Sequence, residues 1–435
     1  MHGKNDRRMM RAYSGHYYDK NKNLESSSGG AATALAEEII NKGGIVYGAV
    51  YEEDYYSARF DYAERIDELG KFKGSKYSFV DKMVIRKGKR ISLYKDVADM
   101  LKQGRSVLVI GLGCDIGSLY KYLLLENVNR TNLYTVELIC NGVTSKVVLK
   151  EYIMAMEELY KSKIVHFNLR HKENKWNPTY IHMKFQNGME IKNRFDFSEY
   201  AYAFYHYKEK MCYKCLYKGV DNHVADLAIG DFWGCNEGMN SYDETGVSVI
   251  ICQSNKGNKL VENLDAESFC VKKIEDISYI LYKQPSYLHR HQIDNEWKEF
   301  DSNLKSIGLM QTVHRIWEKS MPLRIQGKKF SKLIVWGAGK CLKENYFEIE
   351  TICKINCICD SNTKKAKEQF QDKEIIFPDR LKQETDAFVL ITIDNPAIRE
   401  KIANDLIDMN FLYFDFYDNW IKYAKIIWKG NTNDR

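Results

Sequence analysis

The stretch Ser106–Cys114, SVLVIGLGC, decides the fold of this chain. Its apolar run predicts a buried strand over Ser106–Ile110, and the Gly-Leu-Gly that follows predicts a turn where the backbone can approach a ligand closely. Helices are expected on either side, at Val97–Lys102 and Leu119–Leu125, and a second strand is expected at Tyr134–Ile139. This alternation of strands and helices predicts an α/β protein with a partly parallel sheet.

The flanking segments extend this pattern. Ser28–Lys42 carries apolar residues on one helical face and is expected to end at Gly43-Gly44. Asp96 is expected to be the N-cap of the helix at Val97–Lys102. The segments Val165–Arg170 and Ile181–Phe185 look like antiparallel strands, so the pattern leaves α/β and α+β both open.

The length of 435 residues is too great for one hydrophobic core and predicts several domains. The expected divisions are a disordered tail over 1–12, a large domain over 13–284, a helical connector over 285–329 and a small doubly wound, Rossmann-like domain over 330–425.

The composition excludes several classes of protein. The net charge is only +6 and like charges form no long run, so a nucleic-acid-binding arm is not expected. The polar start of the chain does not resemble a signal peptide, and the apolar runs are too short to span a membrane. We therefore expect a cytoplasmic protein, in which the 11 cysteines would be thiols and not disulfides.

Cys212 and Cys215 form the sharpest local motif, because two thiolates at C-x2-C spacing can hold one metal ion or one cluster. A zinc ribbon would need a second such pair, and the chain has none. Cys235 and His223 could complete a zinc site instead, and a redox-active pair is a further alternative.

Cys114 and Cys140 follow two strands that we expect to be neighbours. The carboxyl ends of parallel strands meet at one edge of a sheet, where ligand sites gather. Together with Cys212 and Cys215 they would supply four thiolates, which is enough for one [4Fe–4S] cluster.

Eight short motifs follow one another between Ser26 and Gly234. They are Ser26–Gly30, Gly43–Ala49, Gly74–Tyr77, Gly113–Asp115, Ile139–Gly142, Arg170 with Lys172 and Trp176, Cys212–Cys215, and Asp226 with Gly230–Gly234. In this order they resemble the coenzyme F420 hydrogenase/dehydrogenase beta-subunit family. The resemblance implies an oxidoreductase that carries a flavin, either FAD or FMN, beside one [4Fe–4S] cluster with Cys114, Cys140, Cys212 and Cys215 as its ligands.

The resemblance also implies a set of flavin-binding residues. The small residues that precede the helix at Ser28–Lys42 suit a phosphate at a helix N-terminus, although Ser27 or Ser28 could equally be an ordinary N-cap. Lys76 is expected to neutralise a diphosphate and Tyr77 to stack. The expected cofactor-binding residues are Ser27, Ser28, Gly29, Gly30, Ser75, Lys76, Tyr77 and Asn141.

The sequence departs from the family pattern in ways that concern partners. The N-terminal ferredoxin module of the family is not found, so a separate ferredoxin-like electron donor is expected. Gly113, Asp115 and Asn141 replace the family residues beside the first two cysteines, which leaves the small-molecule substrate, F420 included, undefined. No catalytic residue stands out, no nucleic acid or membrane span is expected, and a homo-oligomer is compatible with the sequence.

The C-terminal domain has an incomplete nucleotide-binding fingerprint. Gly337-Ala338-Gly339 follows the strand Leu333–Trp336, but Leu342 occupies the place of the third glycine. Asp360 ends the next strand, 21 residues after Gly339, as a ribose-binding acid would. The domain resembles Rossmann-like modules found beside sugar-nucleotide and polysaccharide enzymes, and both nucleotide binding and a docking role stay open.

Two functions are compatible with these observations. The first is an iron–sulfur flavoprotein oxidoreductase that passes electrons between an external donor and a substrate, in a setting of polysaccharide or sugar-nucleotide metabolism. The alternative is a non-catalytic, nucleotide-binding adaptor whose redox domain has decayed.

Overall fold

The computed structural model describes residues 10–362, 369–384 and 386–428, which form two compact units. The first unit runs to Asp196 and resumes over Tyr200–Leu309, and the second contains Phe197–Glu199 and the chain from Met310 onward. Residues 1–9 of the predicted tail lie outside the described residues, and the first strand begins at Arg11. The other predicted domain boundaries stay predictions.

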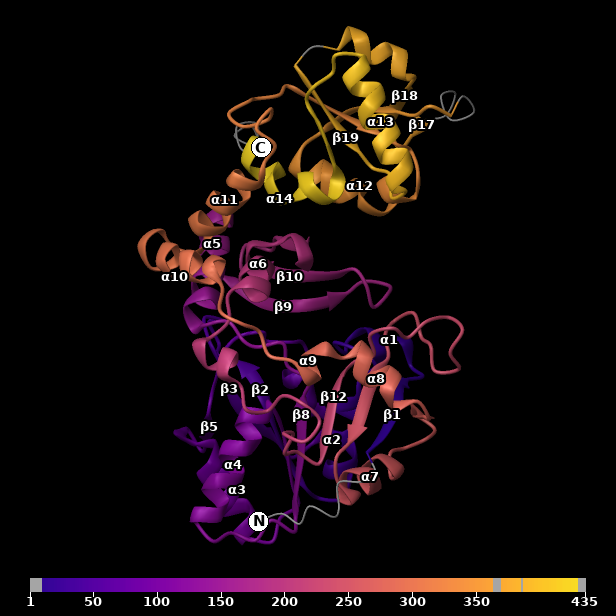
Figure 1. The fold of residues 1–435 in the computed structure, drawn as a ribbon. Coiled ribbons are helices and arrows are strands. Elements are labelled where there is room, and N and C mark those ends of the chain that lie inside the picture. The colour runs from indigo at the N-terminus through magenta and orange to yellow at the C-terminus, as the bar shows by residue number, and fades with distance from the viewer. Residues whose placement is uncertain (1–9, 363–368, 385, 429–435) are drawn as a thin grey trace. The chain divides into compact units, whose positions relative to one another are not determined.

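The first unit is built on a mixed nine-stranded sheet (Figure 1). Its strands, from edge to edge, are β14 (Phe269–Ile274), β1 (Arg11–Tyr17), β13 (Ser248–Cys252), β12 (Leu227–Asp231), β8 (Leu133–Leu138), β7 (Val107–Gly111), β2 (Ile45–Tyr51), β3 (Ala58–Ala63) and β4 (Val80–Asp81). The four central strands β12, β8, β7 and β2 are parallel, and the β14, β1 and β13 side is antiparallel. The predicted α/β class with a partly parallel sheet is therefore confirmed.

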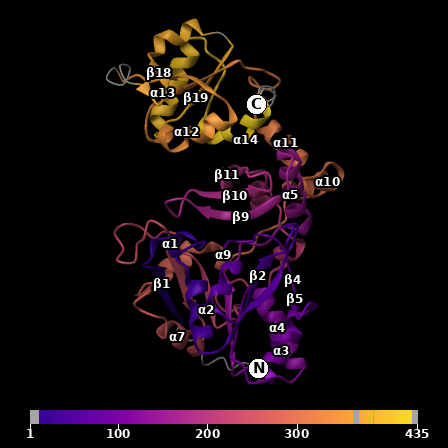
Figure 2. The ribbon, with the colours of Figure 1, turned by 180° about the vertical axis from the view of Figure 1, so that it is seen from behind.

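Helices and smaller sheets surround these strands (Figure 2). The helices are α1 (Lys20–Leu24), α2 (Ala31–Asn41), α3 (Leu93–Lys102), α4 (Gly113–Leu125), α5 (Lys146–Tyr160), α6 (Glu199–His206), α7 (Asn255–Glu262), α8 (Ile277–Lys283), α9 (Pro285–Leu288) and α10 (Asn295–Ile307). A three-stranded sheet contains β9 (Ile164–Lys172), β10 (Thr179–Phe185) and β11 (Glu190–Arg194), and a hairpin contains β5 (Met83–Arg86) and β6 (Lys89–Ser92). The expected antiparallel pair is confirmed as β9 and β10.

The apolar run of β7 is explained by burial on both of its faces. Leu108 packs in a cluster with residues of α2, whereas Val107 and Val109 pack in a second cluster with residues of α3 and α4. Because successive side chains of a strand point to opposite faces, a strand covered on both sides must be apolar throughout.

The predicted start of α3 was wrong. The helix begins at Leu93, after Ser92, so Asp96 lies inside its first turn. The Asp96 carboxylate is buried and accepts hydrogen bonds from Tyr47 Oη at 2.7 Å and Arg86 Nη2 at 2.7 Å. A tertiary ion pair with Arg86 therefore replaces the local cap that the sequence suggested.

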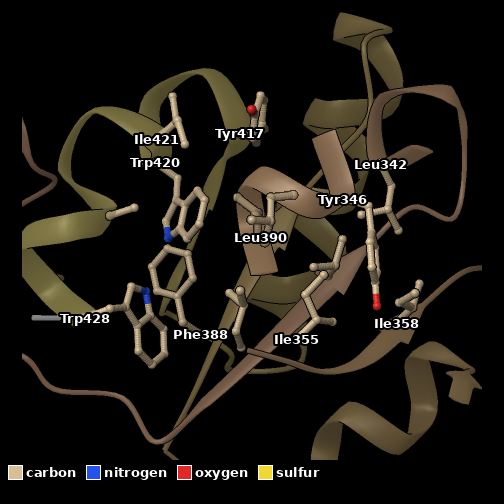
Figure 3. Packing of buried hydrophobic residues seen from close by; sticks show 14 of the residues in the cluster. Leu342, Tyr346, Ile355, Ile358, Phe388, Leu390, Tyr417, Trp420, Ile421 and Trp428 are labelled. Atoms are coloured by element: carbon tan, nitrogen blue, oxygen red, sulfur yellow. The ribbon is translucent and has the colours of Figure 1, made fainter. Parts of the chain in front are cut away.

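The second unit has a six-stranded sheet in the order β17 (Gln369–Phe370), β18 (Lys373–Ile376), β16 (Ile355–Cys359), β15 (Lys332–Trp336), β19 (Ala387–Ile391) and β20 (Phe414–Phe416). All of its pairs are parallel except β17 with β18. Its helices are α11 (Leu309–Ser320), which begins at the end of the first unit, α12 (Lys340–Ile352), α13 (Pro396–Asp408) and α14 (Tyr417–Trp428). Figure 3 shows Trp420 and Trp428 of α14 beside Phe388 of β19 in the core.

Within the described part of the chain, no helix combines the length and the apolar character that a membrane span requires.

The core of the second unit should be sensitive to the loss of a single side chain. Leu390 is 0% exposed in β19, so Leu390→Ala should lower the free energy of unfolding by about 2–5 kcal/mol through lost contacts and a cavity. Leu323 is 86% exposed, and Leu323→Ala should stay within about 0.5 kcal/mol of the parent chain. Urea unfolding followed by tryptophan fluorescence measures both, and equal effects would contradict this view of the core.

Candidate cofactor site

A cavity of about 980 Å³ lies in the first unit, where the central parallel strands end. All of the predicted cofactor-binding residues except Gly29 line it. The loops after β7, β8 and β12 contribute Leu112, the segment around Cys140 and Asp231 to its wall. Ligands commonly bind at the carboxyl ends of parallel strands, and the volume is in the range of cofactor pockets.

The N-terminus of α2 reaches this cavity without a side-chain cap. The N-cap residue is Gly30, in the left-handed region with φ of 93°, while Ser28 Oγ donates to the carbonyl of Val247 at 2.9 Å. The alternative in which Ser27 or Ser28 caps the helix is therefore wrong. Ala32 and Thr33 of the first turn line the cavity, and no described residue accepts from their amides, whereas the amide of Ala31 donates to Ser248 Oγ at 3.5 Å.

Unpaired amides at a helix N-terminus attract an anion, because they carry the positive end of the helix dipole. The first turn of α2 thus fits the diphosphate of a flavin dinucleotide.

Gly29 explains why this segment is glycine-rich although Gly29 itself does not line the cavity. A Cβ at this position would lie 2.1 Å from the carbonyl oxygen of Gly15 and 2.6 Å from the amide nitrogen of Ser248. Its own amide donates to Ser248 Oγ at 3.0 Å. The glycine therefore lets the segment pack directly against β1 and β13, which fixes the start of α2.

Lys76 and Tyr77 lie on the wall, but their polar ends have protein partners. Lys76 Nζ donates to the carbonyls of Lys73 at 2.8 Å and Gly74 at 3.0 Å, and burial lowers its pKa to about 7. The Tyr77 ring packs on Phe204 at 4.3 Å between centroids. The predicted roles of Lys76 on a diphosphate and of Tyr77 in stacking on a flavin stay predictions.

Asn141 also uses its side chain within the protein. Its Oδ1 accepts from Ser286 Oγ at 3.1 Å and pairs with His291 Nε2 at 2.7 Å. These bonds tie the loop after β8 to the segment that follows α8, so Asn141 holds the shape of the wall.

Arg170 lines the cavity and Lys172 bonds to the segment before α2, although the sequence predicted no role for either residue. Arg170 Nη1 lies 2.7 Å from Asp231 Oδ2 and donates to Tyr77 Oη at 2.8 Å. Lys172 Nζ donates to the carbonyls of Ser28 at 2.8 Å and Thr245 at 2.6 Å, which ties β9 to the start of α2. The sequence did contain one indication of a shared role: the two residues are two positions apart in a strand, which places them on the same face.

The four predicted ligand cysteines come together from three parts of the chain. Cys114 lies in the first turn of α4, Cys140 follows β8, and Cys212 and Cys215 lie at a short 3-10 helix over Lys210–Lys214. Desolvation raises the pKa of Cys114, and the nearby thiols of Cys140 and Cys215 raise it further. Burial raises the pKa of Cys212 to about 11, again with contributions from Cys140 and Cys215.

The described residues hold no group of three or more His, Cys, Asp or Glu side chains arranged for a single metal ion. A four-iron cluster spaces its thiolates more widely than one ion does. The zinc alternative is also not favoured, because both ring nitrogens of His223 have partners. Nδ1 lies 2.7 Å from Glu137 Oε1, and Nε2 lies 3.0 Å from the carbonyl oxygen of Tyr287.

Buried positive charge beside the thiols fits an anionic cluster. Lys208 is 1% exposed and its ammonium group donates to the carbonyl of Phe204, with no carboxylate among the described residues in ion-pair contact. Lys218 donates to the carbonyls of Cys140 and Ser286. A buried ammonium group needs a compensating negative charge, and deprotonated thiolates would supply it. The sequence feature that could have indicated this positive charge is the position of Lys208 and Lys218 on either side of the C-x2-C motif.

The glycine turn of the second unit is occupied by its own chain. Asp360 Oδ2 accepts from the amide of Ala338 at 2.9 Å, and its Oδ1 accepts from the amide of Asn362 at 2.9 Å. Gly337 has φ of 117°, and a Cβ there would lie 3.0 Å from the carbonyl oxygen of Thr392. Asp360 thus stabilises the turn, and nucleotide binding at this domain stays a prediction.

One protein family matches part of the chain. Residues 104–277 match the family described as the C terminus of the coenzyme F420 hydrogenase/dehydrogenase beta subunit. This part of the chain is similar to that family. The matched residues contain all four cysteines and the Arg170–Trp176 motif, so the resemblance found in the sequence is confirmed.

Two further comparisons were made. No curated protein matches the chain. One solved structure to which the chain is similar is a chain of the F420-reducing [NiFe] hydrogenase complex from Methanosarcina barkeri, studied by xenon derivatization. The likeness has 18% sequence identity and a TM-score of 0.42, and it covers 68% of this chain and 92% of that chain.

The close approach at Gly29 gives a direct test of how α2 is positioned. Gly29→Ala should destabilise the protein by about 1–3 kcal/mol or more, because backbone atoms of Gly15 and Ser248 block the methyl group. Gly70→Ala is the matched control, since nothing lies within 4 Å of a Cβ there. Urea unfolding of the two variants measures the difference, and a stable Gly29→Ala protein would contradict the packing described.

Proposed function

We propose that this chain is an iron–sulfur flavoprotein oxidoreductase. In this proposal it passes electrons between an external ferredoxin-like donor, a [4Fe–4S] cluster, a flavin and a small-molecule substrate. The observation that supports it best is the position of Cys140, which is one of four neighbouring thiols and also lines the 980 Å³ cavity. A cluster held there would lie directly beside a ligand in that cavity. The family match to hydrogenase and dehydrogenase subunits agrees with redox chemistry.

The residues present fit both groups. Cys114, Cys140, Cys212 and Cys215 would hold the cluster. The first turn of α2 would hold the flavin diphosphate, with Ser27, Ser28 and Gly30 around it. A bound flavin would supply two-electron chemistry and the cluster one-electron chemistry, while the protein would supply position and charge. Arg170 and Asp231 would hold the cavity wall in shape through their ion pair.

The partners are part of the same proposal. The electron donor is a separate ferredoxin-like protein in the cytoplasm, and the substrate is a small molecule of polysaccharide or sugar-nucleotide metabolism. FAD is the flavin expected, and FMN, whose single phosphate can also bind at a helix N-terminus, is the alternative.

Anaerobic purification of the full chain tests the proposal. We expect a brown protein with about one flavin and four irons per chain, measured by visible absorption together with iron, sulfide and flavin assays. A colourless protein free of iron and flavin would instead favour the adaptor function.

Substitution of one ligand should separate cluster binding from folding. Cys212→Ser should lose most of its iron, because a hydroxyl group is a poor substitute for a thiolate ligand. Cys235→Ser should keep its iron, since the contacts of Cys235 are with Ser241 and Asn236 and not with the other four cysteines. Iron content and circular dichroism of both proteins are the measurements. Equal iron in the two variants would contradict the ligand assignment.

A further inference from the structure

Lys208 is unusual among the lysines near the four cysteines. Lys82 forms an ion pair with Asp115 at 2.7 Å, so its charge is already compensated. Lys218 is partly buried and bonds two carbonyls. Lys208 is 1% exposed, and in the described structure a single carbonyl, that of Phe204, accepts from its ammonium group.

The surroundings of Lys208 leave few ways to stabilise this charge. Its Nζ lies 4.1 Å from the centroid of the Phe204 ring, which provides a weak cation–π contact. Its main chain is fixed on both sides, because Trp297 Nε1 donates to its carbonyl at 3.0 Å and its amide donates to Tyr213 Oη at 3.2 Å. The main chain of Lys208 is therefore held in place, and its side chain is buried.

Burial lowers the pKa of Lys208 to about 8, and the sulfur atoms of Cys140 and Cys212 lie close enough to act against that shift. Gly142, which has φ of 89°, lies between them: a Cβ at Gly142 would be 3.0 Å from Lys208 Cδ and 3.4 Å from Cys212 Cβ. The absence of a side chain at Gly142 is what lets Lys208 approach the cysteine loop. The backbone conformation at Gly142 therefore keeps Lys208 close to Cys212.

We propose that Lys208 is the charge-compensating residue of the cysteine site and raises the reduction potential of the cluster held there. This inference rests on the proposed function. Four thiolates make the whole cluster an anion, and the uptake of one electron adds one further negative charge to it. A fixed cation in a poorly solvated position stabilises the more negative form more strongly, and therefore favours reduction.

The test is the midpoint potential of the cluster, measured by a redox titration followed by electron paramagnetic resonance. Lys208→Met keeps the length and the apolar stem of the side chain and removes the charge, so the potential should shift to a more negative value. Lys214→Met is the matched control, because Lys214 lies between Cys212 and Cys215 in the C-x2-C motif but is exposed, where water and salt screen its charge. Its potential should stay at the wild-type value.

The outcomes distinguish this inference from the proposed function. A wild-type chain without iron would overturn both. A wild-type chain with a cluster, together with an iron-replete Lys208→Met protein of unchanged potential, would overturn the role of Lys208 alone. If Lys208→Met fails to fold, Lys208→Gln replaces it. A negative shift that Lys214→Met does not share supports the role, and no shift overturns it.

Discussion

The parallel pairing of β8 with β7 on one side and β12 on the other is the constraint on which the site depends. The register places Gly111 opposite Glu137, and each cysteine follows its partner residue by three positions, as Cys114 and Cys140. The pairing therefore places Cys114 and Cys140 at equivalent positions after the ends of the two strands, at the same edge of the sheet. Such pairing forces both faces of the central strands to be covered, which is why SVLVI is apolar throughout and why α2 lies on one side and α3 and α4 on the other.

Charge is the second organising feature of this edge. The site gathers four thiols, the Arg170–Asp231 ion pair and the buried Lys172 and Lys208. Lys172 is bonded to two carbonyls, so its ammonium group serves to lock β9 onto the start of α2. Lys208 has no such network. Lys172 and Lys208 are both buried, so burial does not distinguish them. They differ in the number of carbonyl acceptors that their ammonium groups have.

Much of this arrangement could be predicted because the deciding signals are local. The strands around Ser106–Cys114, the thiol pair at C-x2-C spacing and the order of the motifs are all properties of short segments. The start of α3 was missed because Asp96 is captured by Arg86 and Tyr47, which are distant in sequence or in another element. Lys208 was missed for the same kind of reason: its main chain is bonded to the side chains of Trp297 and Tyr213, and the residues around position 208 do not predict those contacts.

The two glycine turns of the chain show why a glycine motif alone does not establish a phosphate site. Both turns precede a helix, and both contain a glycine with positive φ, at Gly30 and Gly337. In the second unit the Asp360 carboxylate occupies the amide of Ala338, so the protein itself fills the place of an anion. In the first unit the equivalent residue, Gly29, donates to the neutral hydroxyl of Ser248, which also accepts from the amide of Ala31 at 3.5 Å, and Ala32 and Thr33 line the cavity. What distinguishes the two turns is therefore the charge of the acceptor at the helix start, a carboxylate in the second unit and a neutral hydroxyl in the first, because only the neutral one leaves the positive end of the helix dipole for an anion.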